Sequence, residues 1–204
     1  MRAARRCWAA PDDIANFLLR PTVGSNRPDP LPRTGVRVIL RRLAPADLEN
    51  FQDYRRDPAV ARYQGWSPMP DPEAATFLEQ MRSAACFEPG TWLQLAIAER
   101  NSGALIGDIG VCVAPGGAQA EIGFTLSPKS RGRGLATEAV RAAIGLLFDH
   151  TGVARVVGVT DARNLPSVRL LERVGMHRTG TANAVFRGET CIEHSFAITR
   201  HDGG

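Results

Sequence analysis

The chain has 204 residues and a mass of 22.1 kDa, with 44% hydrophobic and 23% charged residues, a composition typical of one globular domain. Of its 25 basic residues only Lys129 is a lysine, which excludes most chemistry that needs a buried or Schiff-base lysine. No apolar run reaches the ~18 to 20 residues of a membrane span. The apolar stretch near the N-terminus, residues 7–10, is shorter than the ~7 to 15 residues of an export signal, so we expect a cytoplasmic protein without membrane contact.

Residues 1–33 read as an irregular, basic leader. Five of the fourteen prolines fall there. The leader also contains six arginines and three aspartates, so it carries +3 of the net charge of +4. Its only aromatic residues are Trp8 and Phe17, too few to interleave with the arginines, so we expect no nucleic-acid partner. A short helix over Ile14–Leu19 fits the pattern, and residues 201–204 read as a tail.

Residues 34–200 alternate between strand and helix patterns and are expected to form one domain. The strand patterns cover residues 36–40, 93–97, 105–113, 120–126, 155–159, 184–187 and 193–199. The helix patterns cover residues 45–57, 71–81, 135–147 and 166–174. Asp71 is expected to cap the second helix, and Gly175 to end the last one in the left-handed conformation.

These elements predict an α+β fold with a mixed, mostly antiparallel sheet flanked by helices. Residues 120–160 form a strand, a loop, a helix and a second strand. Such a unit is expected to be parallel and right-handed.

A basic, glycine-rich loop precedes the third predicted helix. A helix start offers unpaired backbone N–H groups and a partial positive charge, so it can hold a phosphate. Gly132 and Gly134 leave room for that group, while Arg131 and Arg133 add charged donors. A nucleoside-triphosphate loop would have a lysine where Leu135 stands, and the third glycine of a dinucleotide loop is missing. A glycine-rich connection with solvated arginines remains the alternative.

Three separated segments resemble one family. The run Arg131-x-x-Gly134-x-Ala136, followed by Thr-Glu-Ala, resembles the acetyl-CoA loop of the GCN5-related N-acetyltransferases (GNATs). Residues 164–176 and 38–60 are similar to the branch that acetylates the N-terminal alanines of ribosomal proteins. The resemblance spans residues 34–200 in the family's order. It implies an N-acetyltransferase that moves an acetyl group from acetyl-CoA to a primary amine by direct attack in a ternary complex.

The resemblance also implies where acetyl-CoA lies as cosubstrate. Pantetheine would pair with the strand end Phe124, Thr125 and Leu126, where the next strand splays away. A backbone N–H of Thr125 or Leu126 would stabilise the thioester oxyanion, and Asn164 would bind pantetheine or hold the strand end. The pyrophosphate would lie on the amides of Arg131, Gly132, Arg133, Gly134, Leu135, Ala136 and Thr137.

The attacking amine must lose a proton, because an alkyl amine with a pKa near ~10 is only ~0.1% neutral at pH 7. Glu121 is the candidate base, since its position resembles that of the base in histone-acetylating relatives; a solvated acid at a strand end is the alternative. Glu193 is the second candidate, and a water chain stays open. Ser167 matches the hydroxyl that assists the departing thiolate in this branch, and it can also cap a helix.

The resemblance places the acceptor between the first two helices and the last strands. Tyr63 and Trp66 are candidates for one wall of that site, and anchoring of their loop is the alternative. A small-molecule amine, an amino sugar and a peptide N-terminus remain open as acceptors. We expect no metal, because the histidines lack ligand spacing. Relatives imply a possible homodimer, and a catalytically inactive acyl-CoA-binding module is the alternative function.

Overall fold

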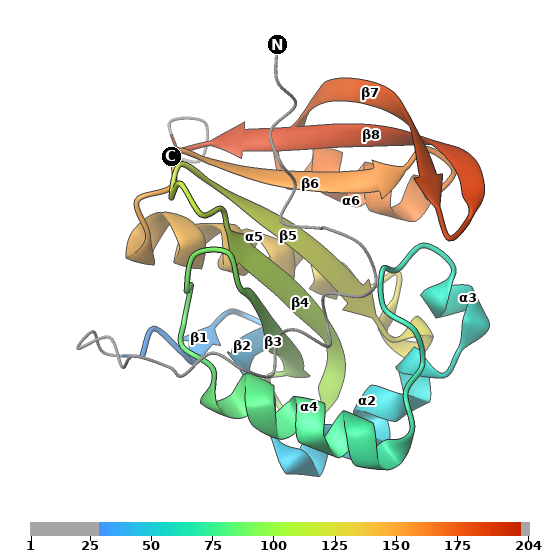
Figure 1. Cartoon of the computed structure of the whole chain (residues 1–204). Helices are drawn as coiled ribbons and strands as arrows, with labels where there is room; N and C mark the ends of the chain where they lie inside the picture. The colour runs from blue at the N-terminus through green and yellow to red at the C-terminus, as the bar shows by residue number, and fades with distance from the viewer. Residues whose placement is uncertain (1–28, 201–204) are drawn as a thin grey trace.

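In the computed structural model, residues 29–200 are described, and they form one eight-stranded sheet with helices on both faces (Figure 1). The strands are β1 Arg33–Thr34, β2 Val38–Arg42, β3 Trp92–Glu99, β4 Leu105–Val113, β5 Gln119–Leu126, β6 Arg155–Asp161, β7 His177–Phe186 and β8 Glu189–Thr199. The helices are η2 Pro45–Asp47, α2 Leu48–Arg55, α3 Pro58–Ala61, α4 Asp71–Ser83, η3 Pro128–Ser130, α5 Leu135–His150 and α6 Leu165–Arg173. The leader up to residue 28, with its expected short helix, and the tail 201–204 lie outside the described residues.

The strand order is β1-β2-β3-β4-β5-β6-β8-β7, and every neighbouring pair is antiparallel except β5 and β6. The predicted α+β class with a mixed, mostly antiparallel sheet is therefore confirmed. The parallel pair is the expected unit in which β5, α5 and β6 follow one another. It lies between an N-terminal half and a C-terminal half of the sheet.

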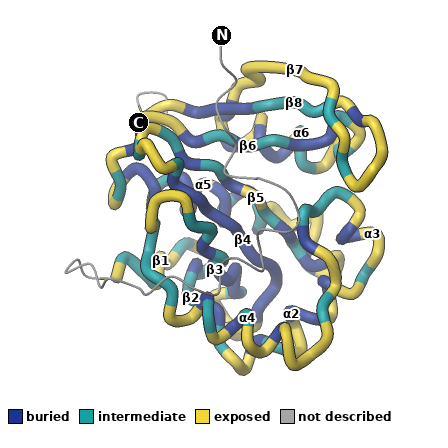
Figure 2. Tube along the Cα trace, in the orientation of Figure 1, coloured by how far each residue is buried: buried dark blue, intermediate teal, exposed yellow. Residues whose placement is uncertain are grey.

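Two apolar layers hold the sheet in place. α5 packs on one face with the predicted stripe, whose buried members are Leu135, Ala139, Val140, Ala143, Ile144 and Leu147. α2 and α4 pack on the opposite face through a second cluster that includes Phe51, Leu78 and Met81. β4 lies between the two layers and is buried along its whole length (Figure 2). Because each large apolar side chain contributes roughly 1.5–3 kcal/mol on burial, this burial stabilises β4, with which β5 pairs.

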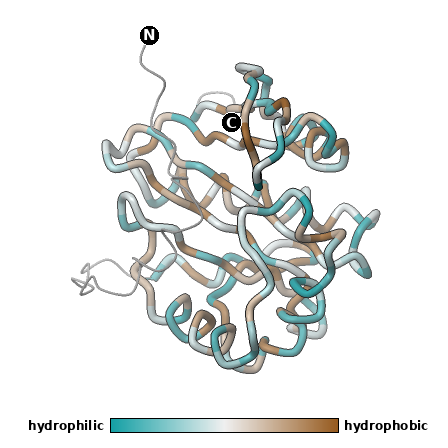
Figure 3. The backbone as a smooth tube through the Cα atoms, turned by 45° about the vertical axis from the view of Figure 1, so that its right-hand side comes forward, coloured by the Kyte–Doolittle hydropathy of each residue, from teal (hydrophilic) through white to brown (hydrophobic). Residues whose placement is uncertain are grey.

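Apolar residues follow the strands through the middle of the molecule, while the turns and outer helix surfaces are more hydrophilic (Figure 3). Gly107 of β4 allows a close strand approach, because a Cβ there would lie 2.3 Å from the carbonyl oxygen of Thr125. Within residues 29–200, no helix combines the length and the apolar character needed to cross a membrane.

β5 and β6 separate after a short stretch of pairing. Their register joins only residues 119–121 to residues 155–157. β5 then continues along β4 as far as Leu126, and β6 continues along β8 as far as Asp161. The two parallel strands therefore diverge and leave a gap between them, as the resemblance predicted.

The structure differs from the sequence expectations at the element ends. Residues 29–33 belong to the fold rather than the leader, since Asp29 pairs with Arg42 (2.7 Å) and Arg33 starts β1. Val36 is exposed outside β2 because a turn precedes that strand. Pro70, not Asp71, is the N-cap of α4.

The C-terminal hairpin is longer than its sequence pattern indicates. β7 begins at His177, before the expected residue 184, and it is exposed along nearly its whole length. A strand that buries neither face has no reason to alternate apolar and polar residues, so the pattern did not reveal it. Arg187 lies in the turn rather than in the strand, with φ of 52°, and Gly188 follows with φ of 79°, as two-residue hairpin turns require.

Candidate active site

The backbone of β5 alternates in direction, and this decides which groups face the gap. Ser127 donates its N–H to the carbonyl of Ile106 on the β4 side (2.8 Å). The carbonyl of Ala118 accepts from the N–H of Ala154, on the β6 side (2.9 Å). The backbone N–H and C=O groups of odd-numbered residues of β5 therefore point toward β4, and those of even-numbered residues point toward β6.

Phe124 and Leu126 consequently present their backbone groups to the gap. The carbonyl of Phe124 accepts a hydrogen bond from Gln64 Nε2 (3.2 Å), and that of Leu126 accepts one from Arg131 Nε (3.3 Å). Thr125 points its backbone toward β4 instead. Of the two amides expected to stabilise an oxyanion, the geometry therefore brings that of Leu126 to the gap and turns that of Thr125 away from it.

The glycine-rich loop lies at the end of this edge and leads into α5. Gly132 and Gly134 both have φ of 75°, and Gly134 is the N-cap of α5. The first intrahelical bond is donated by Glu138 N to Gly134 O (3.2 Å), so the amides of residues 135–137 precede the helical ladder. Glycine-supported turns and a helix start thus present successive amides, which is how proteins hold phosphates.

Gly132 and Gly134 differ in what an added side chain would meet. A Cβ at Gly132 would meet no protein atom within 4 Å, although its φ of 75° disfavours any side chain. A Cβ at Gly134 would instead lie 3.3 Å from Arg37 Nη2. Gly134 is therefore required for its left-handed backbone, and a side chain there would also crowd Arg37.

The arginines of the loop already have partners. Arg133 Nη2 lies 2.8 Å from Glu99 Oε1, in a pair whose arginine side chain is 56% exposed. Arg131 reaches the gap edge through its contact with the Leu126 carbonyl. Of the two, Arg131 therefore stands nearer the gap edge of β5, while Arg133 binds the end of β3.

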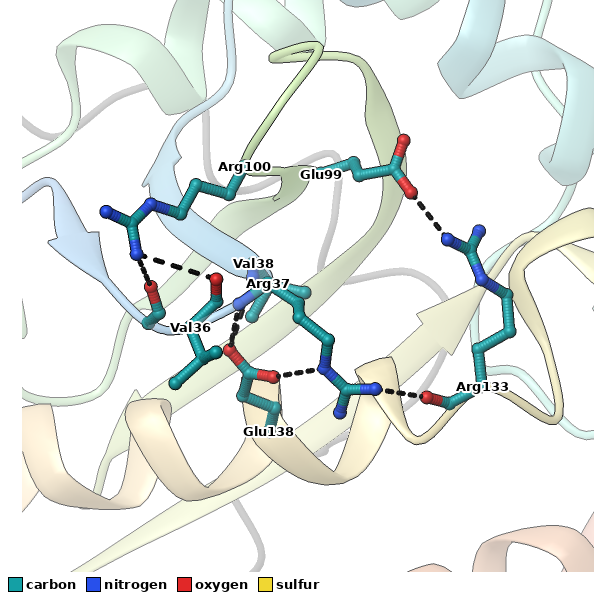
Figure 4. Close-up of polar contacts among 8 residues, drawn as sticks. Val36, Arg37, Val38, Glu99, Arg100, Arg133 and Glu138 are labelled. Atoms are coloured by element: carbon teal, nitrogen blue, oxygen red, sulfur yellow. Dashed lines mark hydrogen bonds and ion pairs between the residues drawn. The ribbon is translucent and has the colours of Figure 1, made fainter.

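A pair that the sequence did not single out braces the loop (Figure 4). Arg37 donates from Nε to Glu138 Oε2 (3.0 Å) and from Nη1 to the carbonyl of Arg133 (2.7 Å). Glu138 Oε1 also accepts the backbone N–H groups of Arg37 (2.7 Å) and Val38 (3.2 Å). About a hundred residues separate these partners, so no local pattern could have identified them.

The Glu138 carboxylate is held in its charged form. Burial on its own raises the pKa of Glu138, but the hydrogen bonds from Arg37 and Val38 outweigh it and hold the pKa below its usual value of 4.5. A depressed carboxyl pKa stabilises the fold above the unfolded-state pKa, and this contribution is lost as the pH falls through the folded-state pKa.

We expect Glu138→Gln to lower the free energy of unfolding near pH 7 by about 1.5–3 kcal/mol, because charge-assisted hydrogen bonds are lost. The difference from the unsubstituted chain should shrink as the pH falls below about 4.5. Urea denaturation at several pH values measures this. A difference that stays constant down to acid pH would contradict the assignment.

Glu121 shares one face of the sheet with Gly123 and Thr125. In the register of β4 with β5, Glu121 is opposite Cys112 and Thr125 is opposite Asp108; Asp108 binds side chains of α2, which fixes this as the α2 face. A Cβ on Gly123, between them, would meet nothing within 4 Å. The half-buried Glu121 therefore borders free space on the α2 face.

Glu193 shares that face but stands far along the sheet. Glu121 is opposite Val157 of β6, whereas Glu193 is opposite Asp161. Four residues of a strand span about 13 Å, so the two glutamates cannot both approach one acceptor nitrogen. Asp161 is paired with Arg163 (2.7 Å), which lowers its pKa.

Asn164 and Ser167 meet at the start of α6, beyond the end of β6. Asn164 is the N-cap, and its Oδ1 accepts the backbone N–H of Ser167 (3.4 Å). The cap is therefore Asn164 rather than Ser167, which leaves the Ser167 hydroxyl available for another role.

The two aromatic residues predicted for the acceptor wall, Tyr63 and Trp66, have different surroundings in the loop between α3 and α4. Trp66 is only 8% exposed and packs against the guanidinium of Arg55, 4.4 Å from the ring centroid, so it anchors the loop. Tyr63 is half-buried beneath Arg62 (5.2 Å) and remains the candidate for an acceptor wall. Arg187 of the β7–β8 turn donates to the carbonyl of Gln64 (3.1 Å), so the hairpin and this loop meet beside the gap (Figure 1).

In residues 29–200, no group of three or more histidine, cysteine, aspartate or glutamate side chains is arranged to hold a metal ion.

The split parallel pair and the amide-lined loop before α5 are the arrangement that the resemblance to the GNAT family implied. A family model described as "Acetyltransferase (GNAT) domain" matches residues 37–177. The chain belongs to the GNAT acetyltransferase family, and the predicted enzyme class, an acetyl-CoA-dependent acetyltransferase, is confirmed.

Individual relatives agree with this placement. An uncharacterized N-acetyltransferase of Bacillus subtilis (strain 168), YoaA, is 30% identical over 145 residues, covering 71% of this chain and 81% of the relative. A GNAT-family acetyltransferase from Bacillus anthracis has the same fold, with a TM-score of 0.75 and 22% identity over 84% of this chain and 99% of that one. Spermidine N-acetyltransferase from Vibrio cholerae, solved with CoA and spermine, has a TM-score of 0.69 and 17% identity over 83% and 99%.

Proposed function

We propose that the chain transfers the acetyl group of acetyl-CoA directly to a primary amine, with no acetyl-enzyme intermediate. The observation that carries this proposal is the gap edge of β5, which leads straight into the left-handed glycines and free amides of the α5 start. One cosubstrate with an amide-bearing arm and a pyrophosphate matches both parts at once. No cysteine stands in the loop to form a covalent intermediate.

Pantetheine is expected to take over contacts that side chains now make. Gln64 and Arg131 donate to the carbonyls of Phe124 and Leu126. The amide N–H groups of a pantetheine arm in the gap would donate to the same carbonyls, as an added strand does. Arg131 would then be free to turn toward the phosphates.

The chemistry follows from this placement. The amine nitrogen attacks the thioester carbon, the carbonyl oxygen gains negative charge, and the C–S bond breaks as the tetrahedral intermediate collapses. The N–H of Leu126 faces the gap and is the donor for that oxygen. The departing thiolate takes a proton or a hydrogen bond from Ser167, and the proton lost by the amine goes to Glu121 directly or through water.

Glu121 is preferred over Glu193 as the base because it stands where the strands part. We expect Glu121→Gln to lower kcat by about 10²–10⁴-fold and to leave the affinity for CoA nearly unchanged. Glu193→Gln is the matched control, since it removes a carboxylate on the same face that is offset by about 13 Å along the strands. Stopped assays of acetylated amine between pH 6 and pH 9 measure the effect. An unchanged rate and pH profile for Glu121→Gln would remove it from this role.

The acceptor is an amine that fits beside Tyr63, between the loop and the β7–β8 hairpin. The spermidine N-acetyltransferase with this fold was solved with a polyamine, which supports a small-molecule amine, while the sequence resemblance favours a protein N-terminus. Acetylation of amines and peptides by the purified chain tests the reaction. A cytoplasmic location and a homodimer remain predictions from the sequence.

A further inference from the structure

Arg37 lies beneath the loop that is proposed to hold the cosubstrate phosphates. It stands just before β2, about a hundred residues from the loop in sequence, yet its guanidinium binds both the loop and the first turn of α5. Nη1 binds the Arg133 carbonyl (2.7 Å), Nη2 would be 3.3 Å from a Cβ on Gly134, and Nε binds Glu138 in the first turn of α5 (3.0 Å). Figure 4 shows this guanidinium between the helix and the loop.

The contact with the Arg133 carbonyl fixes the direction of one amide. In a trans peptide the C=O and the following N–H point in opposite directions. Since the carbonyl of Arg133 points at Arg37, the N–H of Gly134 points away from Arg37. This N–H is therefore a further donor beside the amides of the helix start.

Glu138 fixes Arg37 in turn. Its carboxylate binds the Arg37 side chain and two successive backbone N–H groups at the start of β2. Because the guanidinium is planar and rigid, the bond from Nε to Glu138 also fixes the position of Nη1 at the Arg133 carbonyl. The loop is thus supported from β2 rather than only from its own helix.

We propose that Arg37 is a positioning residue for the cosubstrate phosphates: it holds the Arg133–Gly134 peptide so that the Gly134 amide faces the pyrophosphate. This inference rests on the proposed function. Arg37 does not need to touch the cosubstrate in order to act.

The test compares CoA with pantetheine, which is the same arm without the pyrophosphate and the phosphorylated adenosine. Arg37→Met should raise the Kd for CoA by about 10-fold or more, because a charge-assisted hydrogen bond that orients the loop is lost. The Kd for pantetheine should not change. Arg37→Lys should resemble Arg37→Met although it keeps the charge, since a lysine cannot bind Glu138 and the Arg133 carbonyl as a fork. Calorimetric titration and competition measure both ligands.

Arg100→Met is the matched control. Arg100 is a neighbouring exposed arginine that donates to the carbonyl of Gly35 (3.0 Å) and does not contact the loop (Figure 4). The Arg100→Met substitution removes the same charge from the same region, so the Kd for CoA should stay within about twofold of the value for the unsubstituted chain. The unfolding midpoint of each variant shows that the fold is retained.

Three results would overturn the proposal: equal losses for CoA and pantetheine, full retention of affinity in Arg37→Lys, or equal effects of Arg37→Met and Arg100→Met. A wild-type chain that binds CoA no better than pantetheine would instead overturn the phosphate site of the proposed function. The two failures are therefore distinguishable.

Discussion

Gly134→Val is expected to weaken CoA binding by roughly 100-fold or more. Gly134 has φ of 75°, which a β-branched residue adopts only with strain of about 1–3 kcal/mol. The new side chain would also displace Arg37, since its Cβ would begin 3.3 Å from Nη2. Loss of two oriented amide contacts to a phosphate, at about 1.5–3 kcal/mol each, gives the expected factor. Calorimetric titration with CoA measures it.

Gly116→Val is the control for the added side chain. Gly116 lies in the turn between β4 and β5, has no positive φ, and would place its Cβ in open space. Its substitution should change the Kd for CoA by less than about twofold, in keeping with ordinary surface substitutions. Unaltered CoA binding in Gly134→Val would show that the loop does not hold the phosphates.

Asp108→Ala is expected to lower the free energy of unfolding by about 3–5 kcal/mol, because it leaves a buried charge without its partner. Asp108 is fully buried on β4 and binds Tyr54 Oη (2.5 Å), Arg55 Nη2 (3.1 Å) and Gln94 Nε2 (2.5 Å). Burial and the Asp108 carboxylate raise the pKa of Tyr54 well above 10, so its hydroxyl remains a donor. The Arg55 side chain, which is only 2% exposed, would then be uncompensated.

The same variant should disturb the loop between α3 and α4. Arg55 lies 4.4 Å from the ring centroids of Phe51 and Trp66, so a shift of its guanidinium releases the anchor of the loop that carries Gln64.

Asp53→Ala is the control, since Asp53 and Lys129 form an exposed pair and such pairs contribute about 0–1 kcal/mol. Urea denaturation of both variants separates the two cases. Equal, small effects would mean that the buried network does not stabilise the fold.

Elements with a strong period were predictable from the sequence. β4 and β5 were located to within a residue, and α5 starts at Leu135 as expected, because each buries a regular apolar face against the sheet. The gap between β5 and β6 also followed from the resemblance, since the segments that flank it carry the family's motifs.

The rest depends on contacts that have no local signature. Arg37 and Glu138 meet across about a hundred residues, and Asp108 meets Tyr54 across 54. The sequence pattern did not reveal β7, because an exposed strand with polar residues has the same pattern as a loop. The sequence could not distinguish Thr125 from Leu126 as the donor to the oxyanion. It shows that both residues share a strand, but not which of their backbone groups are bonded to the neighbouring strand.

The central claim is acetyl transfer, and thiol release from acetyl-CoA over a panel of small amines and peptides tests it most directly. We predict amine-dependent thiol release together with the matching acetylated amine, and no acetyl adduct on the intact chain. CoA binding without release of thiol for any amine in the panel would contradict the claim and would indicate an inactive acyl-CoA-binding module.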